Sequence, residues 1–237
     1  MPPATVLITG FGPFPDTPVN ASGPLARRLA SAARQHFAGT RIVSSVLPTE
    51  WTAAPRRLAD LYTRHDPVLA LHFGVSSRVT GLEIERIALN RCALVPDAAG
   101  TLPAAEHLVA DGPADVRATL PVERILARLS AIGVPATHSD DAGSYLCNAL
   151  LYHSVCHAGL RPRCISGFVH IPSGLAGTAE PPAALTLDTA IAGCLEMIAV
   201  CLDALASKPA AEPRRLPGRA SALPAGRSRR AARAGSR

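Results

Sequence analysis

Short runs of aliphatic and β-branched residues alternate along the chain with longer stretches in which apolar positions recur every three or four residues. This alternation is typical of β-α-β units, in which helices connect the strands of a largely parallel sheet. The first run, residues 4–9, is mostly apolar and breaks at Gly10, as expected of a strand buried on both faces. The pattern therefore predicts a fold of the α/β class.

The same pattern gives the expected order of elements. Strands are expected at residues 4–9, 40–47, 68–73, 81–90, 135–138 and 163–170, and helices at residues 24–36, 51–63, 121–132, 145–158 and 182–207. Residues 91–112 show no convincing period, so we expect an irregular excursion there with at most a short hairpin. There is no internal repeat, and a 237-residue chain that is 48% hydrophobic fits one large domain, which we assign to residues 1–207.

The net charge of +6 comes from the end of the chain. Residues 208–237 hold nine basic residues and one acid, whereas residues 1–207 hold 15 basic and 17 acidic residues. The end segment is rich in Pro, Gly, Ala and Arg and has no apolar period, so it cannot bury enough surface to offset its ordering entropy. We expect a disordered basic tail, through which a nucleic acid could bind only weakly.

The six cysteines are scattered, without a C-x-x-C pair or a small disulfide framework, so reduced thiols are expected. The chain starts without a basic region, and its first apolar run is too short for a signal peptide or a membrane span. These features predict a soluble, cytoplasmic protein with no membrane partner.

Ligand sites in open α/β sheets lie beyond the carboxyl ends of the strands. Four expected loops qualify, at residues 10–22, 74–80, 139–144 and 170–177. The third leads into the stretch DAGSYLCN. If Ser144 caps the following helix, Cys147 is its third residue, where unpaired N–H groups and the helix dipole stabilise a thiolate and could hold an oxyanion. The alternative is an inert packing cysteine.

A thiol nucleophile needs a base, and the base needs an orienting partner. His170 has the best position, because it ends the apolar run ISGFV and should lie at the carboxyl edge of the strand after the Cys147 helix. His72 is expected inside a strand as a core residue. The orienting acid could be Glu83, Glu85, Asp140 or Asp141, and spacing alone does not choose among them.

Three residues of the same predicted helix, His153, Cys156 and His157, have the i, i+3, i+4 spacing of metal ligands. No fourth ligand with matching spacing is apparent, and residues in the middle of such a helix usually pack against the sheet. We therefore expect neither a metal nor an organic cofactor.

The first loop, TGFGPFPDTPVNAS, combines Phe11 and Phe14 with Asn20 in a chain that has only five phenylalanines. Aromatic walls with one amide suit a small, flat, apolar ligand that has a lactam edge. The loop contains neither G-x-x-x-x-G-K-[ST] nor G-x-G-x-x-G and has no lysine, which argues against a phosphate loop.

Together these pieces resemble pyroglutamyl peptidase I, the cysteine peptidase family that removes N-terminal pyroglutamate. The matching segments are TGFGPF, VNAS, HFGVS, GLEIER, DAGSYLCN and FVHIP, in family order across most of residues 4–205. The resemblance implies a three-layer α/β/α sandwich with a mostly parallel, mixed sheet. It places the catalytic triad on Cys147, His170 and Glu85, with Glu83 as the alternative acid if the alignment shifts.

By the same resemblance, Phe11 and Phe14 help to wall the pyroglutamyl ring and Asn20 lies near its polar edge. One departure concerns the second loop, where many bacterial members have GQAGGR and this chain has GVSSR. A glutamine that can help to bind the lactam is thus replaced by Val75, as in the animal branch. Residues 91–113 also match the family poorly.

The resemblance implies a cytoplasmic thiol peptidase of the omega peptidase type, which acts on peptides with N-terminal pyroglutamate and can form a homo-oligomer. Two alternatives stay open at this point. One is a related thiol amidohydrolase acting on another small cyclic amide, and the other is a non-catalytic binding protein with the same fold.

Overall fold

The computed structural model describes residues 3–14, 17–161, 163–176 and 185–207, so the predicted tail lies outside the described residues. The helices are α1 (Ser22–His36), α2 (Ala53–His65), α3 (Val122–Ala131), α4 (Leu146–Gly159) and α5 (Leu187–Ser207), with a 3₁₀ turn at Ser173–Ala176. The strands are β1 (Thr5–Phe11), β2 (Arg41–Leu47), β3 (Leu69–Ser76), β4 (Leu82–Glu85), β5 (Ile87–Leu89), β6 (Asp115–Arg117), β7 (Ala136–Ser139) and β8 (Ile165–Pro172).

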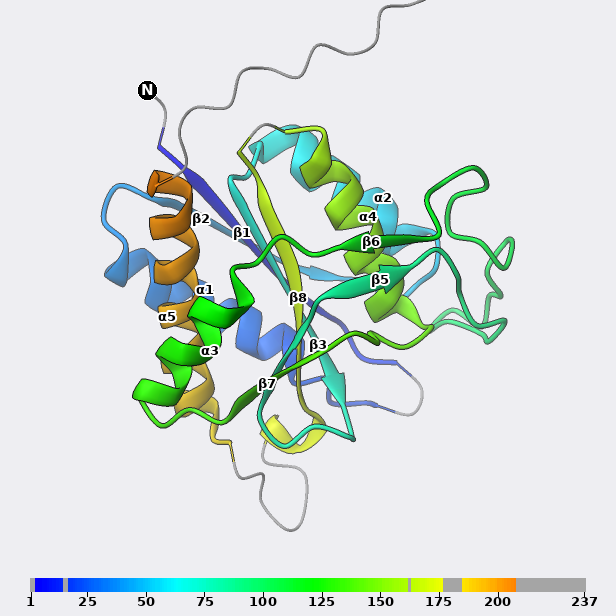
Figure 1. The fold of residues 1–237 in the computed structure, drawn as a ribbon. Helices are drawn as coiled ribbons and strands as arrows, with labels where there is room; N and C mark the ends of the chain where they lie inside the picture. Colours follow the sequence, from blue (N-terminus) through cyan, green and yellow to red (C-terminus); the bar gives the residue numbers. More distant parts are fainter. Residues whose placement is uncertain (1–2, 15–16, 162, 177–184, 208–237) are drawn as a thin grey trace, which may run out of the picture.

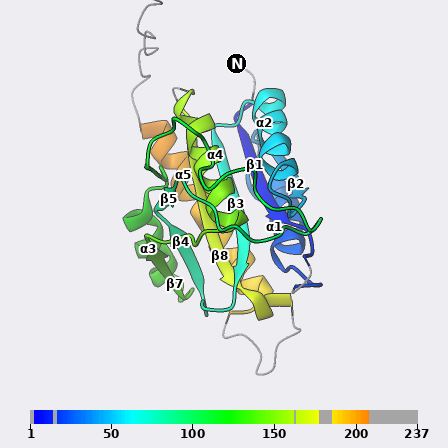
Figure 2. The ribbon, with the colours of Figure 1, turned by 90° about the vertical axis from the view of Figure 1, so that its right-hand side faces the viewer.

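Six strands form one mixed sheet (Figure 1), and Figure 2 shows their order, β2-β1-β3-β8-β4-β7. All neighbours are parallel except β4 and β8, which are antiparallel. The α/β class and the mostly parallel, mixed sheet are therefore confirmed. The loop at residues 139–144 was expected at the carboxyl edge of the sheet together with the other three loops. It follows β7, which runs opposite to β8, so it does not start at the edge where β1, β3 and β8 end. The order of apolar runs cannot reveal this direction, since it depends on which strands pair.

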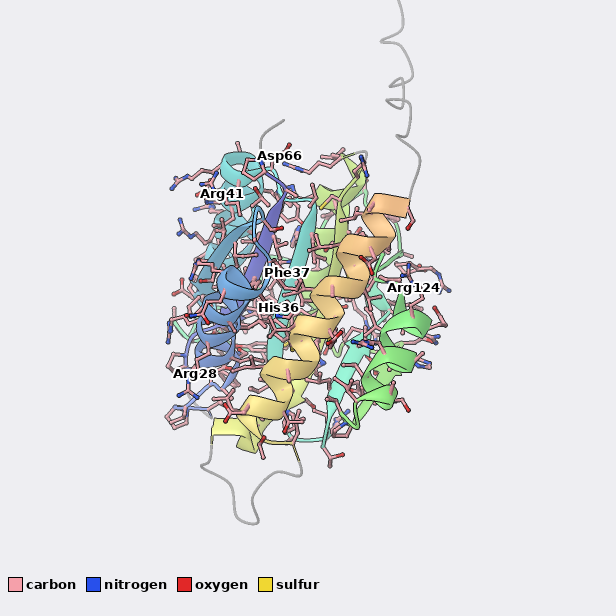
Figure 3. All side chains as sticks on the ribbon, turned by 90° about the vertical axis from the view of Figure 1, so that its left-hand side faces the viewer. Arg28, His36, Phe37, Arg41, Asp66 and Arg124 are labelled. Carbon is pink, nitrogen blue, oxygen red and sulfur yellow. The ribbon has the colours of Figure 1, made fainter. Side chains whose placement is uncertain are left out.

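Helices cover both faces of the sheet, which gives the three-layer sandwich (Figure 2). One face packs against α1, α3 and α5, and α5 lies between the other two helices (Figure 3). The opposite face packs against α2 and α4. Because side chains alternate along a strand, Phe168 and His170 of β8 share the α4 face, whereas Val169 and Ile171 face α5.

Helix α5 is long and apolar enough to cross a membrane by length and composition, with a mean hydropathy of 1.8. Its buried residues include Cys194, Met197, Ile198 and Cys201, which belong to the core cluster between the sheet and α1. Packing against the sheet thus accounts for the apolar character of the buried face of α5.

The strand expected at residues 81–90 is divided at Arg86. The Arg86 backbone N–H still donates to Ser139 of β7, but its carbonyl accepts from Ala118, so the chain leaves the main sheet and forms the β5–β6 ribbon. Residues 91–112 are irregular, as predicted. Asp97 fixes this excursion by accepting hydrogen bonds from the backbone N–H groups of Trp51, Ala99 and Thr101.

Gly10 permits the close approach of β1 to the start of α1. A Cβ atom on Gly10 would overlap the backbone carbonyl of Ser22, and backbone cannot move aside as a flexible side chain can. We expect Gly10→Ala to lower the free energy of unfolding by about 3 kcal/mol, as strong overpacking does. Urea denaturation measures the change. Gly159→Ala, at the open end of α4, has no atom within 4 Å of the new Cβ and should cost nothing. Equal stability of the two variants would contradict this account.

Candidate active site

A cleft of about 820 Å³ is lined by residues from all four of the predicted loops. Phe11, Phe14, Asn20 and Val75, the four residues expected to bind substrate, line it together with Cys147 and His170. Glu85 is not exposed to the cleft. It lies directly behind His170 and is fully buried.

Cys147 lies in the first turn of α4, but the capping differs from the prediction. The N-cap residue is Tyr145 rather than Ser144, and no side chain caps the helix, so Cys147 is the second helical residue. The first helical hydrogen bond runs from Ala149 to the Tyr145 carbonyl. The backbone N–H groups of Cys147 and Asn148 therefore have no helical acceptor and are directed out of the helix end, beside the thiol.

Two neighbours fix the position of the thiol. A Cβ atom on Gly74 of β3 would lie 2.8 Å from the Cys147 Sγ, so only glycine allows the sulfur to approach the sheet this closely. The Asn148 side chain accepts from the backbone N–H of Leu89 and donates to the carbonyls of Leu89 and Arg91. These bonds attach the start of α4 to β5. Asn148 was not singled out from the sequence, although it directly follows Cys147.

His170 is held between the thiol and a buried carboxylate. Its Nδ1 lies 2.6 Å from the Glu85 Oε1, and its ring packs edge-on against Phe168 with centroids 5.0 Å apart. Burial by itself lowers the pKa of His170, but the neighbouring Cys147 and Glu85 outweigh burial and raise this pKa to about 10. The imidazole is therefore a cation at neutral pH.

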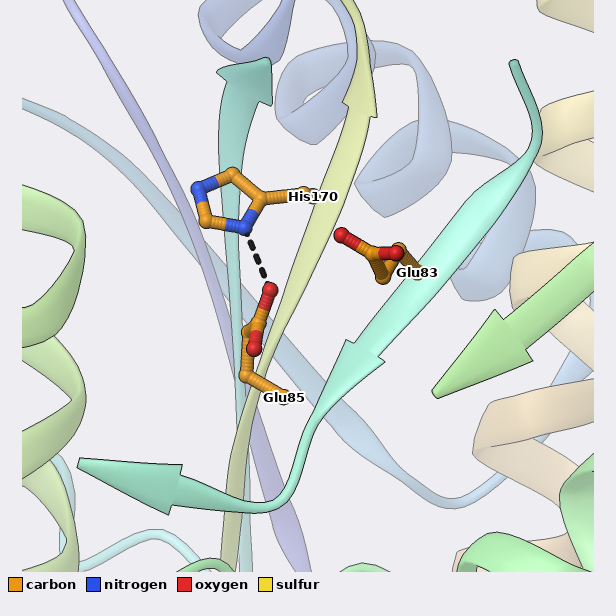
Figure 4. Close-up of side chains that lie close together, drawn as sticks. All are labelled: Glu83, Glu85 and His170. Carbon is orange, nitrogen blue, oxygen red and sulfur yellow. Dashed lines mark hydrogen bonds and ion pairs between the residues drawn. The ribbon is translucent and has the colours of Figure 1, made fainter. Parts of the chain in front are cut away.

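Glu85 and Glu83 lie on the same face of β4, and only Glu85 hydrogen-bonds His170 (Figure 4). Within the described part of the chain the second carboxylate oxygen of Glu85 is buried without a hydrogen-bond partner, so the imidazolium is the only charge that compensates it. Glu83 is half-buried at the edge of the cleft. Burial and the like charge of Glu85 raise the pKa of Glu83, although His170 partly opposes this rise.

The other two acids considered from the sequence interact with other groups. Asp140 is exposed and forms an ion pair with Arg86, which lowers the pKa of Asp140. Asp141 lines the cleft, and its carboxylate accepts the backbone N–H of Gly143. Of the four candidates, the geometry thus pairs Glu85 with His170.

One end of the cleft is walled by aromatic rings. Phe14 lies 6.3 Å from Tyr145 between ring centroids, and Tyr145 packs edge-on against Trp51 at 5.1 Å. The sequence reading overlooked Tyr145, although it stands two residues before Cys147. The Asn20 amide is engaged within its own loop, because it donates to the Gly12 carbonyl and accepts from Ser22. Asn20 therefore shapes the wall of the cleft.

His72 is a buried core residue as predicted, whereas His153 and His157 of α4 are half-buried against tyrosine rings of α4 and α2 instead of the sheet. His72 is fully buried between Thr9 and Ser154, and burial lowers its pKa to about 3, so it is neutral. His157 stacks on Tyr62, and His153 packs edge-on against Tyr152. In the described residues the group with metal-ligand proximity is Glu83, Glu85 and His170, whose donor atoms lie within 4.8 Å of one another. The hydrogen bond between Glu85 and His170 already occupies one possible ligand atom of each of these two residues.

Comparison with known proteins agrees with this geometry. A sequence model described as "Pyroglutamyl peptidase" matches residues 4–204. The pyrrolidone-carboxylate peptidase 1 of Ralstonia nicotianae is 38% identical over 80% of this chain and 88% of the relative. The corresponding protein of Chromobacterium violaceum is 40% identical over 71% of this chain and 77% of the relative.

Solved structures give the same result. Pyroglutamyl peptidase I of Bacillus amyloliquefaciens superposes with a TM-score of 0.75 at 31% identity, covering 85% of this chain and 97% of that one. A pyrrolidone carboxyl peptidase variant of Pyrococcus furiosus gives a TM-score of 0.74 at 29% identity, covering 85% of this chain and 99% of that one. The chain therefore belongs to the pyroglutamyl peptidase family of cysteine peptidases.

Proposed function

We propose that this protein is a cysteine exopeptidase that hydrolyses the amide bond after an N-terminal pyroglutamyl residue, with Cys147, His170 and Glu85 as its catalytic residues. The observation that carries the assignment of roles is the buried Glu85–His170 pair, which faces a thiol at the start of a helix. Membership of the family supplies the substrate class.

In the first half of the reaction, the Cys147 thiolate attacks the pyroglutamyl carbonyl carbon. The negative charge that develops on the carbonyl oxygen is stabilised by the unpaired backbone N–H groups at the start of α4. The His170 imidazolium then gives its proton to the leaving amine as the C–N bond breaks. The products of this half are a thioester on Cys147 and the shortened peptide.

In the second half, neutral His170 takes a proton from water, which attacks the thioester carbonyl. Collapse of the tetrahedral intermediate breaks the C–S bond, releases pyroglutamate and restores the thiolate and the imidazolium. Glu85 holds the ring through Nδ1 and stabilises the cation. Thiol catalysis needs no metal or organic cofactor but does need a reduced cysteine.

The aromatic end of the cleft suits the substrate ring. Phe11, Phe14 and Tyr145 provide flat apolar surface for the pyrrolidone, and Val75 gives this surface no side-chain amide. We therefore infer that backbone groups of the surrounding loops bind the polar edge of the lactam. The family favours this reaction over the two alternatives left open by the sequence.

We place the enzyme in the cytoplasm, with peptides that carry N-terminal pyroglutamate as its substrates. All six cysteines are free, as a reducing compartment requires. We also propose that the protein forms a homo-oligomer and that residues 208–237 bind nucleic acid only weakly.

Removal of the nucleophile tests the reaction directly. We expect Cys147→Ala to lower kcat/KM for a fluorogenic pyroglutamyl amide by at least about 10⁴-fold, because the triad acts as one unit. The matched control is Cys156→Ala, which removes another half-buried thiol from the same helix and should keep most of the activity. Substantial activity in Cys147→Ala would contradict the assignment.

Glu85→Gln tests the role of the buried carboxylate through pH dependence. Cys147 and, to a smaller extent, Glu85 raise the pKa of His170 against the effect of burial; without the Glu85 charge, this pKa should fall below about 10. Loss of the imidazolium ends activity at high pH, so the alkaline limb of kcat/KM should move to lower pH by at least about one unit.

The pH profile of Glu123→Gln provides the control for this measurement. Glu123 is exposed at the start of α3, on the far side of the sheet from α4, and its removal should leave the profile unchanged. An alkaline limb that stays in place in Glu85→Gln would show that Glu85 does not hold the proton on His170.

A further inference from the structure

The cleft has two chemically different ends. Phe11, at the end of β1, belongs to the aromatic end, whereas Glu83 of β4 and Ser139 of β7 line the other. In the sheet order β2-β1-β3-β8-β4-β7, the strand that carries His170 lies between β1 and β4. The catalytic imidazole therefore separates an apolar end of the cleft from a polar one.

The direction of the substrate follows from the chemistry of the imidazole. With the pyroglutamyl ring on the aromatic wall, its carbonyl carbon lies at Cys147, and the leaving amine must lie within reach of the proton on His170. The rest of the leaving peptide then continues past His170, away from the aromatic wall. The first residue after pyroglutamate thus enters the end of the cleft lined by Glu83.

Glu83 is suited to contact that residue. It pairs in register with His170 across the β4–β8 ladder, and its carboxylate points toward the imidazole (Figure 4). Yet in the described residues its carboxylate forms no hydrogen bond or ion pair, because Glu85 occupies the Nδ1 of His170. A half-buried carboxylate that interacts with His170 only through space, without a hydrogen bond, is available to a cation from the substrate.

Apart from the catalytic Cys147 and His170, the charged residues that line the cleft in the described part of the chain are Glu83, Asp141 and Arg78. Asp141 lines the same cleft as Glu83, and Arg78 is exposed and thus well screened by solvent. The nearby Asp140 is neutralised by Arg86. A cationic side chain after pyroglutamate would be attracted here, and an anionic one would be repelled.

We propose that Glu83 is a specificity-determining residue that selects substrates with a basic residue directly after pyroglutamate over substrates with an acidic one. The inference rests on the proposed function and extends it to the leaving side of the scissile bond. Glu83 acts on the substrate itself, whereas Glu85 acts on His170.

The test compares kcat/KM for three peptide amides in which lysine, alanine or glutamate follows pyroglutamate. The wild-type enzyme should prefer lysine over glutamate. Glu83→Gln should reduce this ratio by about tenfold, since it removes both the attraction and the repulsion of one charge at close range. Glu83→Lys should reverse the preference. Glu123→Gln, which removes a carboxylate outside the cleft, should leave the ratio as in the wild type.

The alanine substrate separates failure of this inference from failure of the proposed function. If the wild-type enzyme does not cleave it, the proposed function is wrong. If it is cleaved and the lysine-to-glutamate ratio is the same in wild type and Glu83→Gln, the selection by Glu83 is wrong. An equal slowing of all three substrates by Glu83→Gln would overturn the inference as well, since it would mean that Glu83 acts only through His170.

Discussion

A single buried charge constrains the geometry of this site. Glu85 has no exposed surface, and one of its oxygens has no partner among the described residues, so its negative charge is balanced by His170 alone. Burying an unpaired carboxylate costs several kcal/mol, and the fold avoids this cost only while the imidazole is protonated and held at Nδ1. The same bond directs Nε2 away from Glu85, toward the cleft. Stability and catalytic readiness therefore depend on one contact.

That contact requires the antiparallel step in the sheet. Glu85 lies opposite Phe168 and Glu83 opposite His170, which places both carboxylates on the α4 face beside the imidazole. In a fully parallel sheet, β4 would end at the cleft instead of starting there, and Glu85 would lie nearer the cleft than Glu83. The mixed order thus places Glu85, which is fully enclosed, two residues farther from the cleft along β4 than Glu83, which lies at the cleft edge.

Features that depend on local sequence were predictable. The amphipathic helices and apolar strands followed from spacing, and Cys147 was placed at a helix start because a turn of small residues precedes it. The N-cap was wrong by one residue, since Ser144 is a better capping type than Tyr145, yet the Tyr145 ring is fixed by Trp51 and Phe14. Such long-range packing leaves no signal in local spacing. The direction of β7 and the choice of Glu85 among the four acids depend on which strands pair in the sheet, and local spacing does not show this pairing either.

Glu83 and Glu85 of β4 share one local sequence pattern but differ in their roles. Residues i and i+2 of a strand must point to the same side, so the segment LEIE dictates that both carboxylates approach His170. Their environments then separate them. Glu85 is enclosed and bound to Nδ1, whereas Glu83 remains at the edge of the cleft without a partner in the described residues. The nearby charge of Glu85 disfavours the ionised form of Glu83, and the imidazolium partly relieves this repulsion. A cation on the substrate would relieve it further, which links orientation of the base to recognition of the leaving peptide.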